Sequence, residues 1–399
     1  MSNLILFDDP AIRPALLPFT FTRPVADIRV GILTITEKWT LKLRTEPSFL
    51  AESYLRVKYP LQLTTDNLFI NGAVCPTDEL VDRIKTLSLG ESLISPGGLL
   101  LALRTDRNPT EADQLLDIPQ HTTTFDEPVP TLRQLWSIIA AHGNQLRADF
   151  TLITAGRQSQ PITDPFTRCY APENIFLEEG ATVRASILNA EDGPIYIGRN
   201  ASISEGSVVI GPFALGEGSM VHYNSKMRKN TSVGPYCKIG GEVANSILFA
   251  NSNKGHEGYL GDSVVGEWCN LGAGTNTSNL KNDYSTVKLH SYVTNDLVDT
   301  GRMFCGLIMG DYTRTGIGTM FNTGTVVGVN VNVFGSGLPP KHVPSFSWGG
   351  AQDGFSLYRI EKALRVADEA FKRRERLFDM VEEDILRAVF NAEQANRSL

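Results

Sequence analysis

The chain has 399 residues, of which 42% are hydrophobic and 20% are charged. This balance is typical of a folded globular protein with two or three domains, and it excludes disordered and fibrous classes. The formal net charge of −7 disfavours nucleic acid as the main partner. No apolar run reaches the roughly 18 residues of a membrane span, and the first residues lack the cationic start of a secretory signal. We therefore expect a cytoplasmic protein with no membrane or nucleic-acid partner.

The five cysteines are scattered and never form the close pairs of a zinc site. They are Cys75, Cys169, Cys237, Cys269 and Cys305. We expect reduced thiols in the core and assign no residue as a metal ligand. A catalytic Cys269 acting with the nearby His256 is the alternative.

Residues 1–165 mix strand-like and helix-like segments. The apolar run at residues 4–9 ends in acids, as does the first strand of many α/β sheets. Residues 30–43 predict a turn followed by a helix, residues 68–74 a strand that ends in a glycine turn, and residues 77–87 a second helix. This order of strand and helix predicts an α/β domain.

An internal repeat of six residues follows. Aliphatic residues recur at this spacing at Ile197, Ile203, Val209, Leu215 and Val221, and the register resumes with Val233 and Ile239 after Met227. The same step links Val265 to Leu271, Val287 to Val293, and Ile317 to Thr323 and Val329. A repeat of this regularity predicts a solenoid.

The physical basis of the repeat is simple. Six residues make one short strand and one corner, and three such units close a triangular coil whose aliphatic residues point inward. Coils then stack by parallel hydrogen bonding. We expect this solenoid at residues 171–345, ended by Pro339, Pro340 and Pro344, which cannot join a sheet ladder. The strongly helical pattern of residues 352–397 predicts a C-terminal helical segment.

Two stretches of the first domain resemble sugar-1-phosphate nucleotidyltransferases. TFTRPVADIRVGILTITEKW (residues 20–39) is similar to their signature loop, and LFINGAV (residues 68–74) to the strand that carries their metal-binding aspartate. The resemblance implies a nucleotide site formed by Arg23, Arg29, Asn71 and Gly72.

Ala73 stands where that aspartate is expected. Mg²⁺ is therefore expected only if the domain is active, with Asp8 or Asp9 as the substitute ligand. The alternatives are a domain that binds a sugar nucleotide without turning it over, and a structural domain whose Arg23 and Arg29 are solvated surface charges.

The repeat contains a more specific motif. SNKGHEGYLGDSVVGEWCNLGAGTNTSN (residues 252–279) closely resembles the acetyltransferase domain of the bifunctional N-acetylglucosamine-1-phosphate uridylyltransferase and glucosamine-1-phosphate acetyltransferase family. The resemblance implies a left-handed parallel β-helix of hexapeptide repeats and a homotrimer. The expected fold class is thus an α/β N-terminal domain, a left-handed β-helix and a C-terminal α-helical tail.

The resemblance also implies the site residues. His256 is the expected general base and Asn279 the residue that positions the amine, because imidazole accepts protons near neutral pH. Further residues are expected to bind the sugar phosphate, namely Arg228, Lys254, Tyr259 and Asn270. The backbone around Ala273 is expected to approach the thioester of acetyl-CoA, and Arg314 and Lys341 the phosphates of that cofactor.

Two positions depart from the family. Ala244 replaces its phosphate-binding lysine, and Leu280 the tyrosine after Asn279. We expect an acetyl-CoA-dependent N-acetyltransferase for an amino-sugar phosphate such as glucosamine-1-phosphate, fused to a nucleotidyltransferase-like domain that makes a UDP-sugar. The alternatives are a trimeric scaffold or sugar-nucleotide-binding protein without catalysis, and an acyltransferase for another nucleotide-linked amino sugar.

Overall fold

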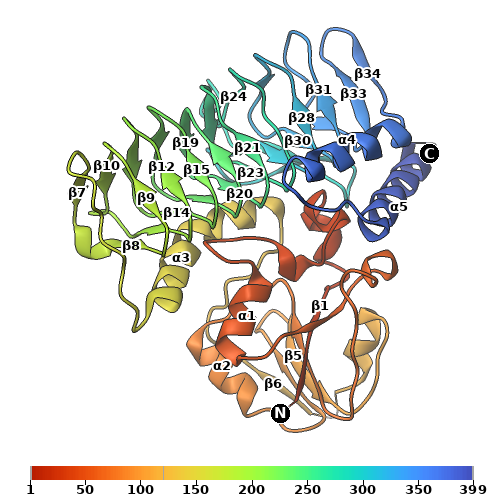
Figure 1. Ribbon diagram of the computed structural model, residues 1–399. Coiled ribbons are helices and arrows are strands. Elements are labelled where there is room, and N and C mark those ends of the chain that lie inside the picture. The colour runs from red at the N-terminus through yellow and green to blue at the C-terminus, as the bar shows by residue number, and fades with distance from the viewer. Residues whose placement is uncertain (1, 120, 398–399) are drawn as a thin grey trace. The chain divides into compact units, whose positions relative to one another are not determined.

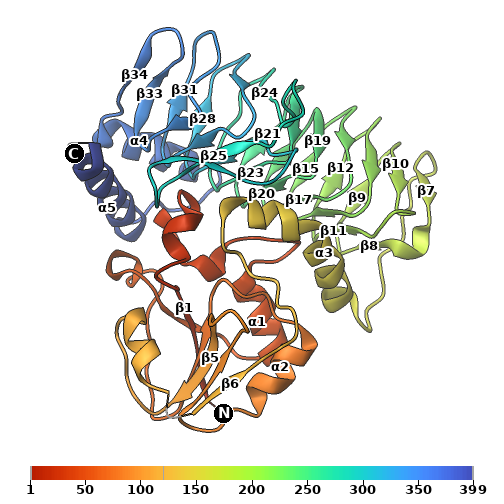
Figure 2. The same ribbon diagram turned by 180° about the vertical axis from the view of Figure 1, so that it is seen from behind.

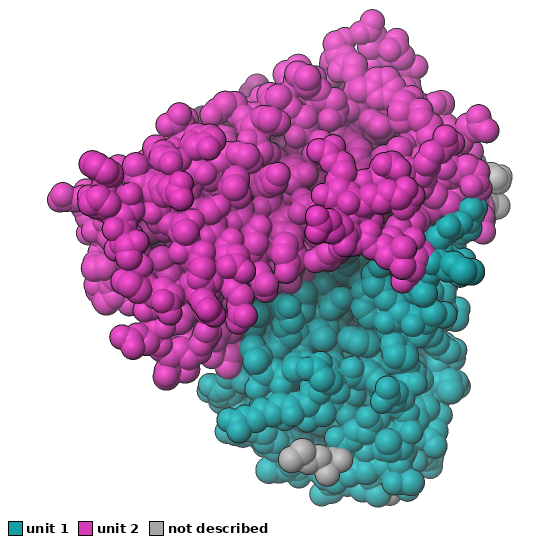
Figure 3. Space-filling model, viewed as in Figure 1, with its two compact units in different colours: residues 1–28, 33–137, 380–388 teal, residues 29–32, 138–379, 389–399 magenta. Residues whose placement is uncertain are grey.

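The structure is a computed structural model that describes residues 2–119 and 121–397. It has two compact units (Figure 3). The first unit holds residues 1–28, 33–137 and 380–388, and the second holds residues 29–32, 138–379 and 389–399. Within the described residues, no helix combines the length and apolar character that crossing a membrane requires.

A six-stranded sheet forms the centre of the first unit (Figure 2). Its strands, in spatial order, are β2 (Ser48–Leu50), β1 (Asn3–Phe7), β3 (Asn67–Asn71), β5 (Leu100–Thr105), β4 (Glu91–Ile94) and β6 (His121–Thr124). β1 runs parallel to β2 and β3, whereas β5 is antiparallel to β3 and β4. Ile5, Phe7 and Phe69 pack in its core. The predicted strands at residues 4–9 and 68–74 are confirmed as β1 and β3.

The helices of this unit begin at capping residues. Thr34 accepts a hydrogen bond from the Glu37 amide before α1 (Ile35–Leu43), and the Glu37 carboxylate accepts one from the Thr34 amide. Thr77 caps α2 (Asp78–Lys85) in the same way, through the Leu80 amide. Both helices lie in the predicted segments. The sequence analysis did not predict α3 (Leu135–Thr154).

Short 3₁₀ turns complete the irregular parts of the chain. They are η1 (Arg13–Leu16), η2 (Phe19–Phe21), η3 (Val25–Asp27), η4 (Ser53–Leu55), η5 (Ala112–Asp117) and η6 (Pro172–Asn174). The first three follow β1 directly, and the loop that resembles the nucleotidyltransferase signature therefore begins as a run of tight turns.

The second unit is a parallel β-solenoid with three faces (Figure 1). The first face holds β7 (Arg168–Tyr170), β10 (Ile187–Asn189), β13 (Val208–Ile210), β16 (Lys226–Met227), β19 (Glu242–Ala244) and β22 (Tyr259–Gly261). A separate parallel pair is β24 (Asn276–Thr277) and β29 (Met320–Phe321). The second face holds β8 (Ile175–Leu177), β11 (Ile195–Ile197), β14 (Phe213–Leu215), β17 (Thr231–Val233), β20 (Ile247–Leu248), β23 (Val264–Val265), β27 (Ile308–Met309), β30 (Val326–Val327) and β32 (His342–Val343).

The third face is also built of short strands. Its strands are β9 (Thr182–Val183), β12 (Ser202–Ile203), β15 (Met220–Val221), β18 (Lys238–Ile239) and β21 (Asn253–Lys254), followed by β28 (Arg314–Thr315), β31 (Asn332–Val333), β33 (Ser347–Gly350) and the antiparallel β34 (Gly354–Leu357). Isolated bridges through Asn270 join β21 to β28. The outward column of this face therefore runs without a break from Lys238 to Arg314.

The six-residue register predicts the solenoid core correctly over most of its length. Residues at that spacing from Ile197 to Ile239 are buried, as is Leu271. The register was wrong at Val293 and Ile317, which are 59% and 84% exposed. The antiparallel hairpin of β25 (Lys288–Ser291) and β26 (Asp296–Asp299) interrupts the coils, and Phe321 and Val327 take the inward positions after it.

The end of the solenoid lies later than the prolines predicted. β32 and β33 continue the second and third faces after Pro339 and Pro340, because neither proline lies within a strand. The C-terminal segment then forms α4 (Ile360–Lys372) and α5 (Met380–Arg397). α4 buries Leu364, Ala367 and Phe371, as its apolar spacing predicts. The predicted fold class, an α/β domain followed by a parallel β-helix and a helical tail, is confirmed.

Candidate functional site

His256 lies at an exposed corner of the solenoid, between the end of β21 and the start of β22. The next coil passes directly over this corner, since the Gly274 amide donates to the Glu257 carbonyl at 3.0 Å. Gly258 must be glycine here: its φ is +129°, and a Cβ would lie 2.0 Å from the Thr275 carbonyl oxygen. Gly258 thus allows two adjacent coils to approach closely next to His256.

Lys254 supports this corner from inside the coil. It pairs in register with Ile239 and occupies the same inward column, where it is 2% exposed. Its ammonium donates to the carbonyls of Gly240 at 3.0 Å and His256 at 2.8 Å. Burial lowers the pKa of Lys254 to about 8. The structure therefore places Lys254 inside the solenoid, where it holds the backbone of His256, and not on the surface where a sugar phosphate would bind.

Asn279 and Tyr259 come together on the first face. The Asn279 Nδ2 donates to the Tyr259 hydroxyl at 3.1 Å and to Asp262 Oδ2 at 2.6 Å. Asn245 Nδ2 donates to the other oxygen of Asp262, also at 2.6 Å. Burial, together with the Asp262 carboxylate, raises the pKa of Tyr259. The network fixes Asn279 with both amide hydrogens occupied, and its Oδ1 remains able to accept.

Gly261 leaves the space that this network needs. A Cβ at Gly261 would lie 2.4 Å from the Tyr259 hydroxyl and 2.7 Å from Asn279 Nδ2. The sequence analysis did not assign Asp262 or Asn245. The Gly-Asp pair inside the quoted motif was the signal for Asp262, whereas Asn245 has no motif of its own.

Arg228 lies on the same face, after β16. Its guanidinium contacts Glu242 at 3.1 Å and is half exposed. Glu242 pairs in register with Tyr259. The positive charge of Arg228 partly offsets the rise in the pKa of Tyr259. A cation, a phenol and an amide are therefore gathered on the first face, next to the His256 corner.

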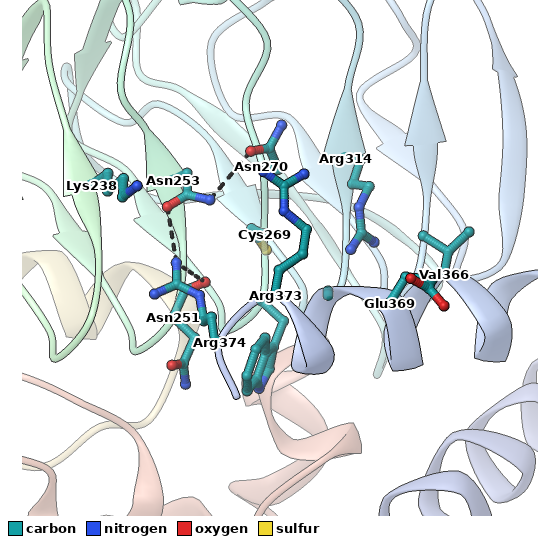
Figure 4. A pocket seen from close by; sticks show the side chains of 12 residues that line it. Lys238, Asn251, Asn253, Cys269, Asn270, Arg314, Val366, Glu369, Arg373 and Arg374 are labelled. Carbon is teal, nitrogen blue, oxygen red and sulfur yellow. Dashed lines mark hydrogen bonds between the residues drawn. The ribbon is translucent and has the colours of Figure 1, made fainter. Parts of the chain in front are cut away.

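Asn270 and Arg314 lie together on the third face, not beside Tyr259. They are bridged partners in adjacent coils. The Asn253 amide reaches Asn270 Oδ1 at 3.4 Å, and Arg314 donates to the Tyr312 carbonyl at 3.1 Å. Burial lowers the pKa of Arg314. Both side chains line the pocket drawn in Figure 4.

The Ala273 backbone lies in the corner that covers the His256 corner. Its carbonyl accepts from the Gly318 amide at 2.7 Å, and its own N–H has no hydrogen-bond acceptor among the described residues. Lys341 is elsewhere: its ammonium binds Thr323, and burial lowers its pKa. Lys341 precedes β32 on the second face, whereas Arg314 belongs to the third, and the structure does not bring the two expected phosphate contacts together.

The cysteine alternative is wrong. Cys269 is 1% exposed and its thiol lies inside the coil, 3.2 Å from the Gly310 carbonyl. Burial raises the pKa of this thiol well above its ordinary value. Cys75, Cys237 and Cys305 are buried as well, and Cys169 is half-buried. All five cysteines are free.

In the first unit, Asn71 and Gly72 end β3 beside the end of β1. Asn71 Nδ2 donates to the Leu100 carbonyl at 3.0 Å and to Asp9 at 3.3 Å. Gly72 packs closely, since a Cβ would meet the Phe7 carbonyl at 3.1 Å. Arg23 and Arg29 are 4% and 8% exposed, which makes the alternative of solvated surface charges wrong. Arg29 belongs to the second unit, where it binds the Ile32 carbonyl.

The acids at the end of β1 do not form a metal site. Asp8 is buried, accepts from the Val25 amide at 2.7 Å and lies 3.5 Å from Arg13; burial raises its pKa to about 7. Asp9 caps a turn through the amides of Ala11 and Ile12. Among the described residues, no three His, Cys, Asp or Glu side chains gather as metal ligands. Asp8 and Asp9 thus both have hydrogen-bonding partners within the protein.

Parts of the chain are similar to known proteins. A family model described as sugar nucleotidyl transferase matches residues 4–158. The bifunctional protein GlmU of Methanocaldococcus jannaschii is 37% identical over 119 residues, which are 30% of this chain and 28% of that protein. The bifunctional sugar-1-phosphate nucleotidylyltransferase/acetyltransferase of Sulfurisphaera tokodaii is 34% identical over 153 residues, 37% of this chain and 38% of that protein.

These matches cover much less than two thirds of either relative. Among solved structures, that of the polySia specific acetyltransferase NeuO aligns with 52% of this chain and 93% of that chain, with a TM-score of 0.27 and 11% identity. Residues 4–158, which match the sugar nucleotidyl transferase family model, thus precede a parallel β-solenoid in this chain. In sequence the chain is similar to bifunctional GlmU-type proteins over 30% to 37% of its length.

Proposed function

We propose that the solenoid is an acetyl-CoA-dependent N-acetyltransferase that acts on an amino-sugar phosphate. The observation that carries the proposal is the network of Asn279, Tyr259 and Asp262 beside the His256 corner. An amide and a phenol are hydrogen-bonded there, and His256 lies three residues before Tyr259 in the same motif. This set suits an acceptor substrate that carries an amine, hydroxyls and an anion.

In this proposal His256 is the general base. It takes a proton from the substrate amine while the nitrogen attacks the thioester carbonyl of acetyl-CoA. The carbon–sulfur bond then breaks, and the CoA thiolate takes up a proton. A positioned base of this kind contributes roughly 10²–10⁴-fold to the rate. The Lys254 ammonium is a positioning group, because its hydrogen bond to the His256 carbonyl fixes the corner.

Asn279 and Tyr259 orient the acceptor. Both Asn279 amide hydrogens are donated within the protein, which leaves Oδ1 to accept from the amine. The Tyr259 hydroxyl accepts from Asn279, and its hydrogen is free for a substrate oxygen. Arg228 supplies a cation on the same face for the sugar phosphate, in place of the lysine that Ala244 replaces.

The Ala273 amide is the proposed donor to the oxyanion of the tetrahedral intermediate. Two observations support this role for the Ala273 amide. Its N–H has no acceptor among the described residues, and it belongs to the coil that covers the His256 corner. Backbone donors aimed at a developing oxyanion typically contribute about 10²–10³-fold. Assembly as a homotrimer is also proposed, and its test is a solution mass of three times the 43.8 kDa chain.

For the first domain we propose binding of a sugar nucleotide without transfer. Ala73 supplies no carboxylate, Asp8 is buried against Arg13, and Asp9 caps a turn. The test is release of pyrophosphate from UTP and N-acetylglucosamine-1-phosphate with Mg²⁺. Release at a rate above that of a heat-inactivated sample would contradict this part of the proposal.

A substrate panel tests the acyl transfer. The purified full chain is mixed with acetyl-CoA and glucosamine-1-phosphate, glucosamine, or a UDP-linked amino sugar, and free CoA thiol is measured. The proposal predicts thiol release with the amino-sugar phosphate and little with glucosamine, which lacks the anion for Arg228. Fastest release with the UDP-linked sugar would move the activity to the other acceptor class. No release above hydrolysis with any amine would overturn the proposal.

A further inference from the structure

A second polar site lies under helix α4, apart from the Tyr259 and Asn279 network. It is a pocket of about 510 Å³ within the second unit, between the outward column of the third face and the end of α4 (Figure 4). Lys238, Asn253, Asn270 and Arg314 line it from the solenoid, and Arg373 and Arg374, which directly follow α4, line it from the other side.

The pocket is cationic and its charges are not paired with carboxylates. Glu369 is the single acid in its lining, and it contacts Lys372 at 3.0 Å. Across the parts of the chain that the structure describes, no carboxylate lies within 4 Å of Arg314, Arg373 or Arg374. Burial lowers the pKa of both Arg314 and Arg374. Holding these guanidinium groups desolvated without a counter-charge is costly, and a bound anion would offset that cost.

The walls of the pocket are fixed before any ligand binds. Arg374 donates to the Asn251 carbonyl at 3.1 Å and to Asn253 Oδ1 at 3.0 Å. Trp268, at the pocket edge, stacks on Phe371 of α4 with ring centroids 3.8 Å apart. Asn251 is 4% exposed, and its Oδ1 is a buried acceptor with no donor. The site therefore presents cations to an anion and one amide oxygen to an N–H or O–H group.

Spacing limits the size of the ligand. Lys238 and Arg314 belong to one column and are three rungs apart, with Asn253 and Asn270 between them. Rungs about 4.8 Å apart put the two residues roughly 14 Å apart along the solenoid. One phosphate group cannot contact both. Figure 4 shows Arg373 extending from α4 toward Asn270, in the middle of this span.

We propose that this pocket binds the diphosphate of a small organic ester that also carries a hydrogen-bond donor. Guanidinium groups bind phosphate oxygens in pairs, and an extended ligand would reach from Lys238 to Arg314. The site adds Lys238, Arg373 and Arg374 to the residues of the proposed acyl transfer. Two sources share this chemistry, coenzyme A and a nucleotide sugar.

Calorimetric titration of the full chain distinguishes these sources. The probes are inorganic pyrophosphate, coenzyme A and UDP-N-acetylglucosamine. The proposal predicts that pyrophosphate binds weakly and that one of the two esters binds at least about tenfold more tightly, because only an ester spans the column. The ester that binds more tightly identifies the source. Binding of neither ester to the wild-type chain would overturn the proposal.

Variants locate the site. Arg373→Ala and Lys238→Ala are each expected to weaken binding of the preferred ester about tenfold, since each removes one charge-assisted contact. Arg365→Ala is the matched control: Arg365 is exposed on the same helix and does not line the pocket. Equal affinity of the wild-type chain, Arg373→Ala and Lys238→Ala would refute the assignment. These titrations measure binding without turnover, so a failure of the acyl-transfer proposal leaves this test intact.

Discussion

Asn279 donates from Nδ2 to the buried carboxylate of Asp262 at 2.6 Å, and this contact ties the end of the motif to its middle. Asp262 also accepts a hydrogen bond from the Asn245 side chain of the preceding coil. The Asp262 carboxylate thus orients the Asn279 side chain, which we propose binds the substrate amine. Asp262 itself acts through Asn279 and is a positioning residue.

Asp262→Asn tests that relationship. The substituted amide can accept at only one oxygen, and either Asn279 or Asn245 then lacks an acceptor. We expect kcat/KM for acetyl transfer to fall about tenfold with a small change in Tm, because asparagine tolerates the φ of +47° at this position. An unchanged kcat/KM would show that the Asn279 orientation does not depend on Asp262.

Gly261→Ala adds one methyl group between Tyr259 and Asn279. The Cβ would lie within 2.7 Å of both polar atoms, so at least one side chain must move. A displacement of about 1 Å in a site can cost about 100-fold in rate, and we expect a loss of that order. Gly97→Ala is the control, because its nearest neighbour would be 3.9 Å away. Equal activity of the two variants would contradict the close packing at Gly261.

Lys254→Met tests the buried lysine through pH. The pKa of Lys254 is lowered from 10.5 to about 8, which corresponds to about 3 kcal/mol of destabilisation while the lysine is charged. This cost is present in full below pH 8 and is relieved as the pH rises toward 10.5, because the unfolded chain then holds the extra proton. The unfolding free energy of the wild-type chain, measured against Lys254→Met, is expected to increase over that range. A difference that stays constant with pH would contradict the burial of a titrating lysine.

Thiol titration tests the placement of the cysteines. Burial raises the pKa of Cys237, Cys269 and Cys305, to about 12 for Cys237 and Cys305, and Cys75 is also buried. We expect only the half-buried Cys169 to react rapidly with a thiol reagent in the native chain, and all five thiols after unfolding. Cys269→Ser should retain acetyl transfer. Loss of turnover in that variant, with an unchanged Tm, would restore the cysteine alternative.

The sequence predicted the parts of the molecule that depend on local pattern. The six-residue step identified the inward column from Ile197 to Ile239. The quoted motif predicted His256, Tyr259 and Asn279 as site residues, and the structure joins the last two by a hydrogen bond. The step failed at Val293 and Ile317, because the hairpin of β25 and β26 shifts the chain out of register. An insertion of this kind has no six-residue signature of its own.

Other residues needed the three-dimensional structure. The resemblance implied that Lys254 binds the sugar phosphate, yet its place in the ladder puts it beside Ile239, inside the coil. Asn270 falls on a different face from Tyr259, although only 11 residues separate them. Arg373 and Arg374 line the same pocket as Lys238, and sequence spacing does not reveal that arrangement.

The most direct test of the central claim is the rate of acetyl transfer in His256→Ala. The account predicts that kcat/KM falls by about 10²–10⁴-fold, while the Tm and the affinity for coenzyme A stay at wild-type values. His121→Ala, which removes an exposed histidine from β6 of the first unit, is expected to match the wild-type rate. A His256→Ala rate within a factor of about three of the wild-type rate would contradict the assignment of His256 as the general base.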